Sequence, residues 1–147
     1  MSISLLLHLL AAMFWIGGMA FAHFALRPAA IATLAPPQRL PLLAEALGRF
    51  FKLVMIAVLV LLATGLHIIF ATGGFAAVRP GVHVMFGVGV VMMLIFGYIA
   101  HGAYPKMRRH VEAQEWPAAA ARLDTIRKLV MVNLVLGVLI VVAVKAN

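Results

Sequence analysis

Four long apolar stretches, separated by more polar segments, dominate the pattern of hydrophobic and polar residues along the chain. They cover about residues 3–25, 50–71, 82–104 and 129–145. A helix needs roughly 20 residues to cross a bilayer, and only a helix can satisfy the backbone hydrogen bonds of such a single segment in lipid. The pattern therefore predicts an all-α integral membrane protein with four spans.

A sequence repeat relates the first two spans to the last two. The letters KLVM occur at 52–55 and again at 128–131, an offset of 76 residues. Pro41 and Pro117 precede the two copies at the same offset, and proline is tolerated in the first turn of a helix. We therefore expect the second and fourth helices to cover about 41–71 and 117–145. The predicted fold is an antiparallel four-helix bundle of two tandem hairpins, forming one domain over residues 1–147.

The composition changes this picture little but excludes several classes of function. The chain has 147 residues, of which 65% are hydrophobic and 11% charged, too few charges to cover a soluble domain. It contains no cysteine, which excludes disulfides and thiolate metal sites. We attribute the net charge of +8 to membrane topology and lipid contacts, and we expect no nucleic-acid partner.

The basic residues are unequally divided between the two sides of the predicted bundle. Of the twelve, only Arg79 and Lys145 lie outside the segments that follow the first and third spans. Basic loops stay in the cytoplasm, so both termini are expected on the outer side. We predict a multi-pass protein of the bacterial inner membrane with periplasmic termini, in contact with the lipid bilayer; the oligomeric state stays open.

Histidines carry the most informative chemistry. His8 and His83 lie near the outer ends of the first and third spans, one residue away from the repeat offset, and His67 lies at a similar level in the second span. An imidazole within a membrane is costly unless it is paired, hydrated or bound to a metal. Two hairpins related by a rotation would place His8 and His83 on opposite sides of the axis, where they could clamp a central group.

Haem and copper are the two candidates for that group. Haem iron accepts axial imidazoles, and without cysteine the haem would be a noncovalent b type. We expect His8 and His83 as axial ligands, His67 as a substitute or neighbouring partner, and electron transfer with a quinol or a periplasmic redox protein. Copper transport or copper tolerance is the alternative, with His8, His67 and His83 as a site of three nitrogens, because imidazole and thioether ligands suit copper and the chain has nine methionines.

Two further interpretations stay open. His23 and His101 end the first and third spans on the inner side, where they are either interfacial residues or a second site. The chain can also be interpreted as a structural or partner subunit without a cofactor.

Four segments carry a family resemblance: HLLAAMFWIGGMAFAHFALRPA from residue 8, LGRFFKLV from 47, ATGL from 63 and GVHVMF from 81. They resemble the small copper-resistance protein D (CopD) family of four-helix membrane proteins, which implies a role connected with copper. More distantly, the chain resembles the haem-containing bacterial protoporphyrinogen oxidases. There a first-span histidine that matches His8 is implicated in haem binding, whereas the position that matches His83 is a lysine. That likeness implies a haem site at His8, and the departure at His83 favours two histidine ligands over the oxidase activity.

Overall fold

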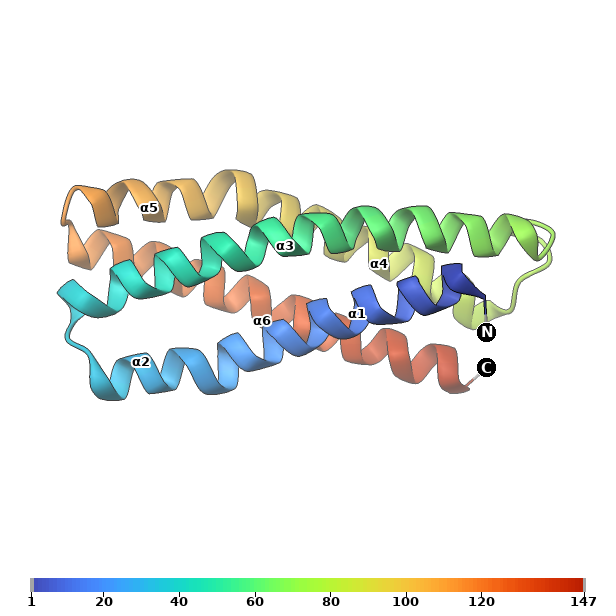
Figure 1. The fold of residues 1–147 in the computed structure, drawn as a ribbon, viewed down its shortest axis with the longest axis horizontal. Helices are drawn as coiled ribbons and strands as arrows, with labels where there is room; N and C mark the ends of the chain where they lie inside the picture. The colour runs from blue at the N-terminus through green and yellow to red at the C-terminus, as the bar shows by residue number, and fades with distance from the viewer. Residues whose placement is uncertain (1, 147) are drawn as a thin grey trace.

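Four long helical rods run antiparallel along the molecule in this computed structural model, which describes residues 2–146 (Figure 1). The first rod consists of α1 (Ile3–Phe21), a π-helical segment η1 (Ala22–Leu26) and α2 (Arg27–Thr33). The second is α3 (Pro36–Ala71). The third consists of α4 (Pro80–Tyr98), the π-helical segment η2 (Ile99–Ala103) and α5 (Tyr104–Glu112), and the fourth is α6 (Trp116–Ala146). No strand occurs among the described residues.

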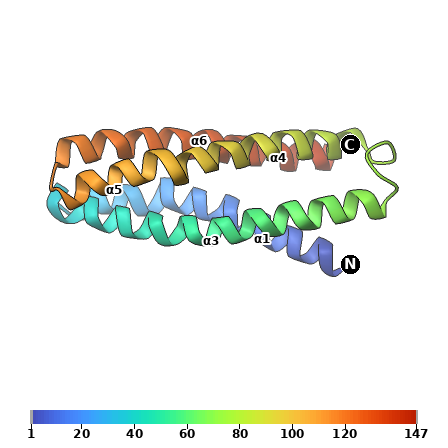
Figure 2. The ribbon, with the colours of Figure 1, turned by 90° about the horizontal axis from the view of Figure 1, so that it is seen from above.

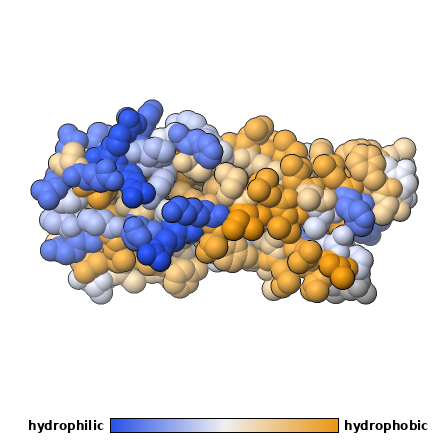
Figure 3. All heavy atoms as spheres, turned by 45° about the horizontal axis from the view of Figure 1, so that its top comes forward, coloured by the Kyte–Doolittle hydropathy of each residue, from blue (hydrophilic) through white to orange (hydrophobic). Residues whose placement is uncertain are grey.

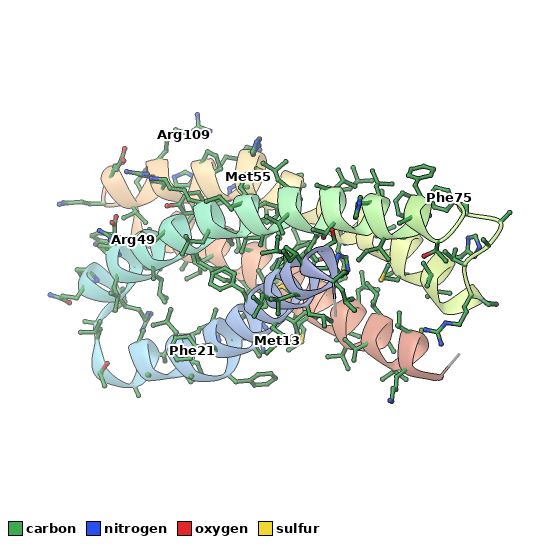
Figure 4. All side chains as sticks on the ribbon, turned by 45° about the vertical axis from the view of Figure 1, so that its right-hand side comes forward. Met13, Phe21, Arg49, Met55, Phe75 and Arg109 are labelled. Carbon is green, nitrogen blue, oxygen red and sulfur yellow. The ribbon has the colours of Figure 1, made fainter. Side chains whose placement is uncertain are left out.

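All four rods are long and apolar enough to cross a membrane. α1 packs mainly on α3, and α4 mainly on α6, so each hairpin is a closely packed unit. Large apolar side chains cover the outside, among them Met13 and Phe21, which are 67% and 61% exposed (Figure 4). Such a surface suits lipid rather than water. The predicted all-α membrane bundle of two tandem hairpins is therefore confirmed.

The helix starts agree with the prediction in one hairpin and differ in the other. α6 begins at Trp116, next to Pro117, as expected. α3 begins at Pro36, five residues before Pro41, which lies inside the helix. Pro36 and Pro37 occupy the first helical positions. An N–H group there would have no acceptor within the helix, so proline loses no hydrogen bond. Pro41 then removes a single hydrogen bond, to the carbonyl of Pro37, and the helix continues through it.

The two halves of the bundle differ in charge. Ten basic residues and all four acidic residues lie toward the connections 34–35 and 113–115, and we call this part the basic half. The other part, which we call the terminal half, contains both chain ends and the connection 72–79. Figure 3 shows polar residues gathered over one end of the molecule beside a broad apolar surface. Ion pairs such as Arg49–Glu45 at 2.9 Å bridge successive turns in the basic half.

Buried residues show the internal repeat in three dimensions, with two different offsets. α3 and α6 follow the offset of 76 that KLVM predicts. Their matching buried pairs are Leu43 with Ala119, Val54 with Val130, and Leu61 with Gly137. The first and third rods follow an offset of 77. Their matching pairs are Trp15 with Met92, Met19 with Phe96, and Ala30 with Met107.

The two π-helical segments are also 77 residues apart. The N–H of Arg27 donates to the carbonyl of Ala22, and that of Tyr104 donates to the carbonyl of Ile99, five residues back in each case. A π turn therefore occurs at the same place in both hairpins.

An aromatic cluster of Trp15, Phe51, Phe96 and Tyr104 joins the two hairpins near the middle of the bundle. Its rings meet edge to face, with centroids 5.8 Å apart for Phe51 and Phe96, and 5.5 Å apart for Phe51 and Tyr104. The Tyr104 hydroxyl donates to the carbonyl of Ala44 at 2.7 Å. Gly48 makes this approach possible, because a Cβ atom there would overlap the Tyr104 hydroxyl. This contact ties the third rod to α3.

Replacing Tyr104 with phenylalanine should lower the free energy of unfolding by about 0.5–1.5 kcal/mol, since the hydroxyl's hydrogen bond to α3 is lost while the ring still packs. Tyr98→Phe is the matched control, because Tyr98 is 58% exposed and lies outside the cluster. Reversible unfolding in mixed micelles of mild and denaturing detergent measures both variants. Equal stability of the two would contradict the role given to the Tyr104 hydroxyl.

Candidate functional site

A cavity of about 510 Å³ lies between the two hairpins in the terminal half. Seen from above, the hairpins form two layers, one with α1 and α3 and one with α4 and α6, that separate toward the chain ends (Figure 2). All four rods contribute to the lining, which is mostly apolar. Its basic or imidazole-bearing residues are His8, Arg79 and Lys145. We call this space the outer cavity.

His8 is held in one tautomer by α3. Its Nδ1 lies 2.9 Å from Oγ1 of Thr64, and the hydroxyl of Thr64 already donates its only proton to the carbonyl of Val60 at 2.6 Å. With its proton on the carbonyl of Val60, Oγ1 of Thr64 is placed to accept a hydrogen bond from Nδ1–H of His8. In the neutral imidazole this leaves the lone pair on Nε2, the form in which histidine binds metals.

Gly65 completes the support of His8. A Cβ atom on Gly65 would lie 3.4 Å from Cε1 of His8, so the imidazole ring rests directly against the backbone of α3. Thr64 and Gly65 are consecutive and both buried. One turn of α3 therefore sets both the tautomer and the position of the ring.

Three methionines of α4 line the outer cavity together with His8: Met85, Met92 and Met93. The offset of 77 makes Met85 the counterpart of His8 and Met92 the counterpart of Trp15. Sequence reasoning treated Met85 as one of nine methionines and did not single out Thr64 at all. The spacing of buried residues in the first and third rods identifies Met85. The KLVM repeat does not reveal that spacing.

His83 does not line the outer cavity, so the structure does not bring the expected pair His8 and His83 together there. His83 is exposed in the first turn of α4, and its ring centroid lies 6.2 Å from that of Phe75 in the connection 72–79 (Figure 4). At the offset of 77 its counterpart is Leu6, which is also exposed. His83 precedes Met85 by two residues, and two residues turn a side chain by about 200° around a helix.

His67 also lies outside the cavity lining. It is exposed on α3, and its Nδ1 forms a 2.8 Å hydrogen bond with Oγ of Ser4, which fastens the start of α1 to α3. Among residues 2–146, no three side chains of histidine, aspartate or glutamate gather into a metal-binding group. The expected site of three histidine nitrogens is therefore not formed by His8, His67 and His83 within the described part of the chain.

The inner histidines lie in the π-helical segments. His23 of η1 lines a small cavity of about 40 Å³ with Arg27 and Arg127, and its Nδ1 is buried without a hydrogen-bond partner. His101 of η2 is exposed and does not line that cavity. His23 and His101 are 78 residues apart, one more than the offset of 77 that relates the first and third rods. They therefore lie on different faces of those two rods. The two residues do not form a joint site.

The outer cavity has a closed floor and a positively charged mouth. Trp15 and Met92 lie at its inner limit, and the aromatic cluster fills the bundle beyond them. Arg79 precedes the first residue of α4, and Lys145 lies in the last turn of α6. The cavity therefore lies on the side of the chain ends, and the aromatic cluster packs between it and the basic half.

The family model of copper resistance protein D matches residues 44–146, which is more than half of the chain. The matched part contains Thr64, Met85 and both cations of the cavity mouth, whereas His8 precedes it. Neither a curated protein nor a solved structure matches the chain.

The hydrogen bond to Thr64 predicts one histidine tautomer. In protein with ¹⁵N-labelled histidine, Nδ1 of His8 should give the resonance of a protonated nitrogen, and Nε2 that of an unprotonated one. Thr64→Val removes the acceptor and should give a mixture of tautomers, whereas Thr64→Ser should keep the wild-type signal. An unchanged His8 spectrum in Thr64→Val would show that Thr64 does not set the tautomer.

Proposed function

The chain belongs to the copper resistance protein D family, and from this membership and the outer cavity we propose that it is a copper-resistance membrane protein that binds Cu(I) at His8. The observation that carries the proposal is the 2.9 Å hydrogen bond between Nδ1 of His8 and Oγ1 of Thr64, which in the neutral imidazole with Nδ1 protonated leaves the lone pair on Nε2 for a metal. Copper is the cargo of this protein in the proposal, not a resident cofactor.

The side chains around His8 favour Cu(I) over other metals. Thioether sulfur is a soft ligand that selects Cu(I), and imidazole also suits copper. Met85 is the first thioether candidate, because it occupies on α4 the place that His8 occupies on α1. Met92 and Met93 lie seven and eight residues further along α4, about 10–12 Å deeper at the helical rise. Among residues 2–146, no carboxylate side chain lines the outer cavity, which disfavours Mg²⁺ and Ca²⁺.

The distribution of charge supports an orientation for this site. Basic segments are retained in the cytoplasm, so the basic half faces the cytoplasm of a bacterial inner membrane and both termini face the periplasm. The outer cavity then opens to the periplasmic side, where it would capture copper. Passage to the cytoplasm would require the aromatic cluster to separate, because that cluster closes the floor.

Removing a proposed ligand should weaken Cu(I) binding by at least about tenfold, which is about 1.4 kcal/mol of binding free energy. The variants are His8→Ala and Met85→Leu. Their matched controls are His83→Ala and Met13→Leu, since His83 and Met13 lie outside the outer cavity. Competition of the purified protein with a chromophoric Cu(I) chelator gives the affinity of each variant.

Thr64→Val should weaken Cu(I) binding by about 10–100-fold, the usual effect of removing a group that orients a histidine ligand. Wild-type affinity in His8→Ala would overturn the proposed site, and so would an equal loss in His83→Ala. Colourless protein that binds no Cu(I) and stays folded after His8, His67 and His83 are all replaced would instead support a structural or partner subunit.

A noncovalent b-type haem is the second candidate ligand, and the volume and apolar lining of the outer cavity favour it. His8 would supply one axial nitrogen, and a thioether of α4 rather than His83 would be the available second ligand. Arg79 and Lys145 would face its carboxylates. A bound haem would supply one-electron redox chemistry toward a quinol or a periplasmic protein. A Soret band in purified protein that disappears in His8→Ala would favour haem over copper, and colourless protein that binds Cu(I) would exclude it.

A further inference from the structure

Both basic residues of the terminal half line the outer cavity. The chain has twelve basic residues, ten of which lie in the basic half, and the remaining two are Arg79 and Lys145. They come from different hairpins, Arg79 from the start of α4 and Lys145 from the end of α6. Two positive charges at the mouth of an apolar space are complementary to a molecule with an anionic head and an apolar body.

The depth of the outer cavity corresponds to one leaflet of a bilayer. At the α-helical rise, its lining spans about 21 Å from Arg79 to Met93, and about 12 Å both from His8 to Ile16 and from Gly137 to Lys145. Half of a typical hydrocarbon core is about 15 Å, and the headgroup region adds several Å more. These lengths suit a cavity whose mouth is at the level of the headgroups and whose floor at Trp15 is near the middle of the bilayer.

A copper ion would leave most of this space unfilled. The volume of about 510 Å³ falls within the range of about 300–1,000 Å³ that is usual for pockets that hold small molecules. Apart from the groups at His8 and the mouth, the walls consist of side chains such as Leu9, Ile16 and Ile140. An acyl chain is the apolar body that a membrane supplies in abundance.

We propose that the outer cavity binds an anionic phospholipid of the outer leaflet, with one acyl chain inside and the phosphate between Arg79 and Lys145. The lipid site itself depends only on the cavity and its cations, so it stands whether or not the copper site does.

Two glycines of α4 provide a test of the cavity itself. A Cβ atom on Gly89 or on Gly87 would meet no other atom within 4 Å, so both positions accept a larger side chain. Gly89 lines the outer cavity, whereas Gly87 is exposed and does not. Gly89→Phe should therefore fill the space that the acyl chain needs, and Gly87→Phe is its matched control.

The experiment measures the phospholipid that stays bound to the full chain. Delipidated protein is incubated with vesicles containing equal amounts of phosphatidylglycerol and phosphatidylethanolamine, re-isolated in mild detergent, and its lipids are counted by mass spectrometry. Wild type and Gly87→Phe should retain phosphatidylglycerol preferentially, and Gly89→Phe should lose it. Arg79→Gln with Lys145→Gln should weaken retention by about 30-fold, at the usual contribution of a basic side chain to anionic-lipid binding. The control variant Lys106→Gln with Arg109→Gln removes the same charge from the basic half and should retain phosphatidylglycerol as the wild type does.

Other outcomes overturn the proposal. Equal retention of the two phospholipids would show that the head charge is not recognised, and equal retention by Gly89→Phe and Gly87→Phe would place the lipid outside the outer cavity. Fatty acid or a Soret-absorbing compound in place of phospholipid would identify a different occupant. The copper titration of His8→Ala is independent of these results, because His8 is unchanged in every variant used here.

Discussion

The contact between the two hairpins at the aromatic cluster is the interaction on which the rest of the structure depends. Tyr104 reaches the backbone of α3 where Gly48 leaves room, and the rings of Phe51, Phe96 and Trp15 fill the adjacent space. Toward the basic half, α5 packs closely on α6 and also contacts α3. Toward the chain ends the hairpins separate, and the outer cavity lies between them. The cluster is thus both the joint of the bundle and the floor of the site.

Charge and packing act together in the terminal half. α3 supplies the hydroxyl that hydrogen-bonds His8, α4 lines the same cavity with three methionines, and the cations at the mouth come from the start of α4 and the end of α6. No single hairpin contains the complete arrangement. A site of this kind therefore requires that both hairpins be present and held at a fixed distance.

Much of the fold could be predicted from sequence, because four apolar runs leave few alternatives in a membrane and KLVM gives the true offset of α3 and α6. The site was harder to predict. The second offset of 77 is carried by buried residues such as Trp15 and Met92, which share no letters. The KLVM offset therefore suggested His83 as the partner of His8, although His83 lies two positions before Met85, the true counterpart of His8. The start of α3 at Pro36 was missed because one proline inside a helix costs a single hydrogen bond, which a long membrane helix tolerates.

The π turns of η1 and η2 have a consequence for the history of the chain. A π turn arises when one residue is inserted into an α-helix, and such turns are rare. Both hairpins carry one at equivalent positions, from Ala22 and from Ile99. One ancestral insertion explains this more simply than two separate ones. If the two hairpins descend from one, that ancestral hairpin already had the π turn.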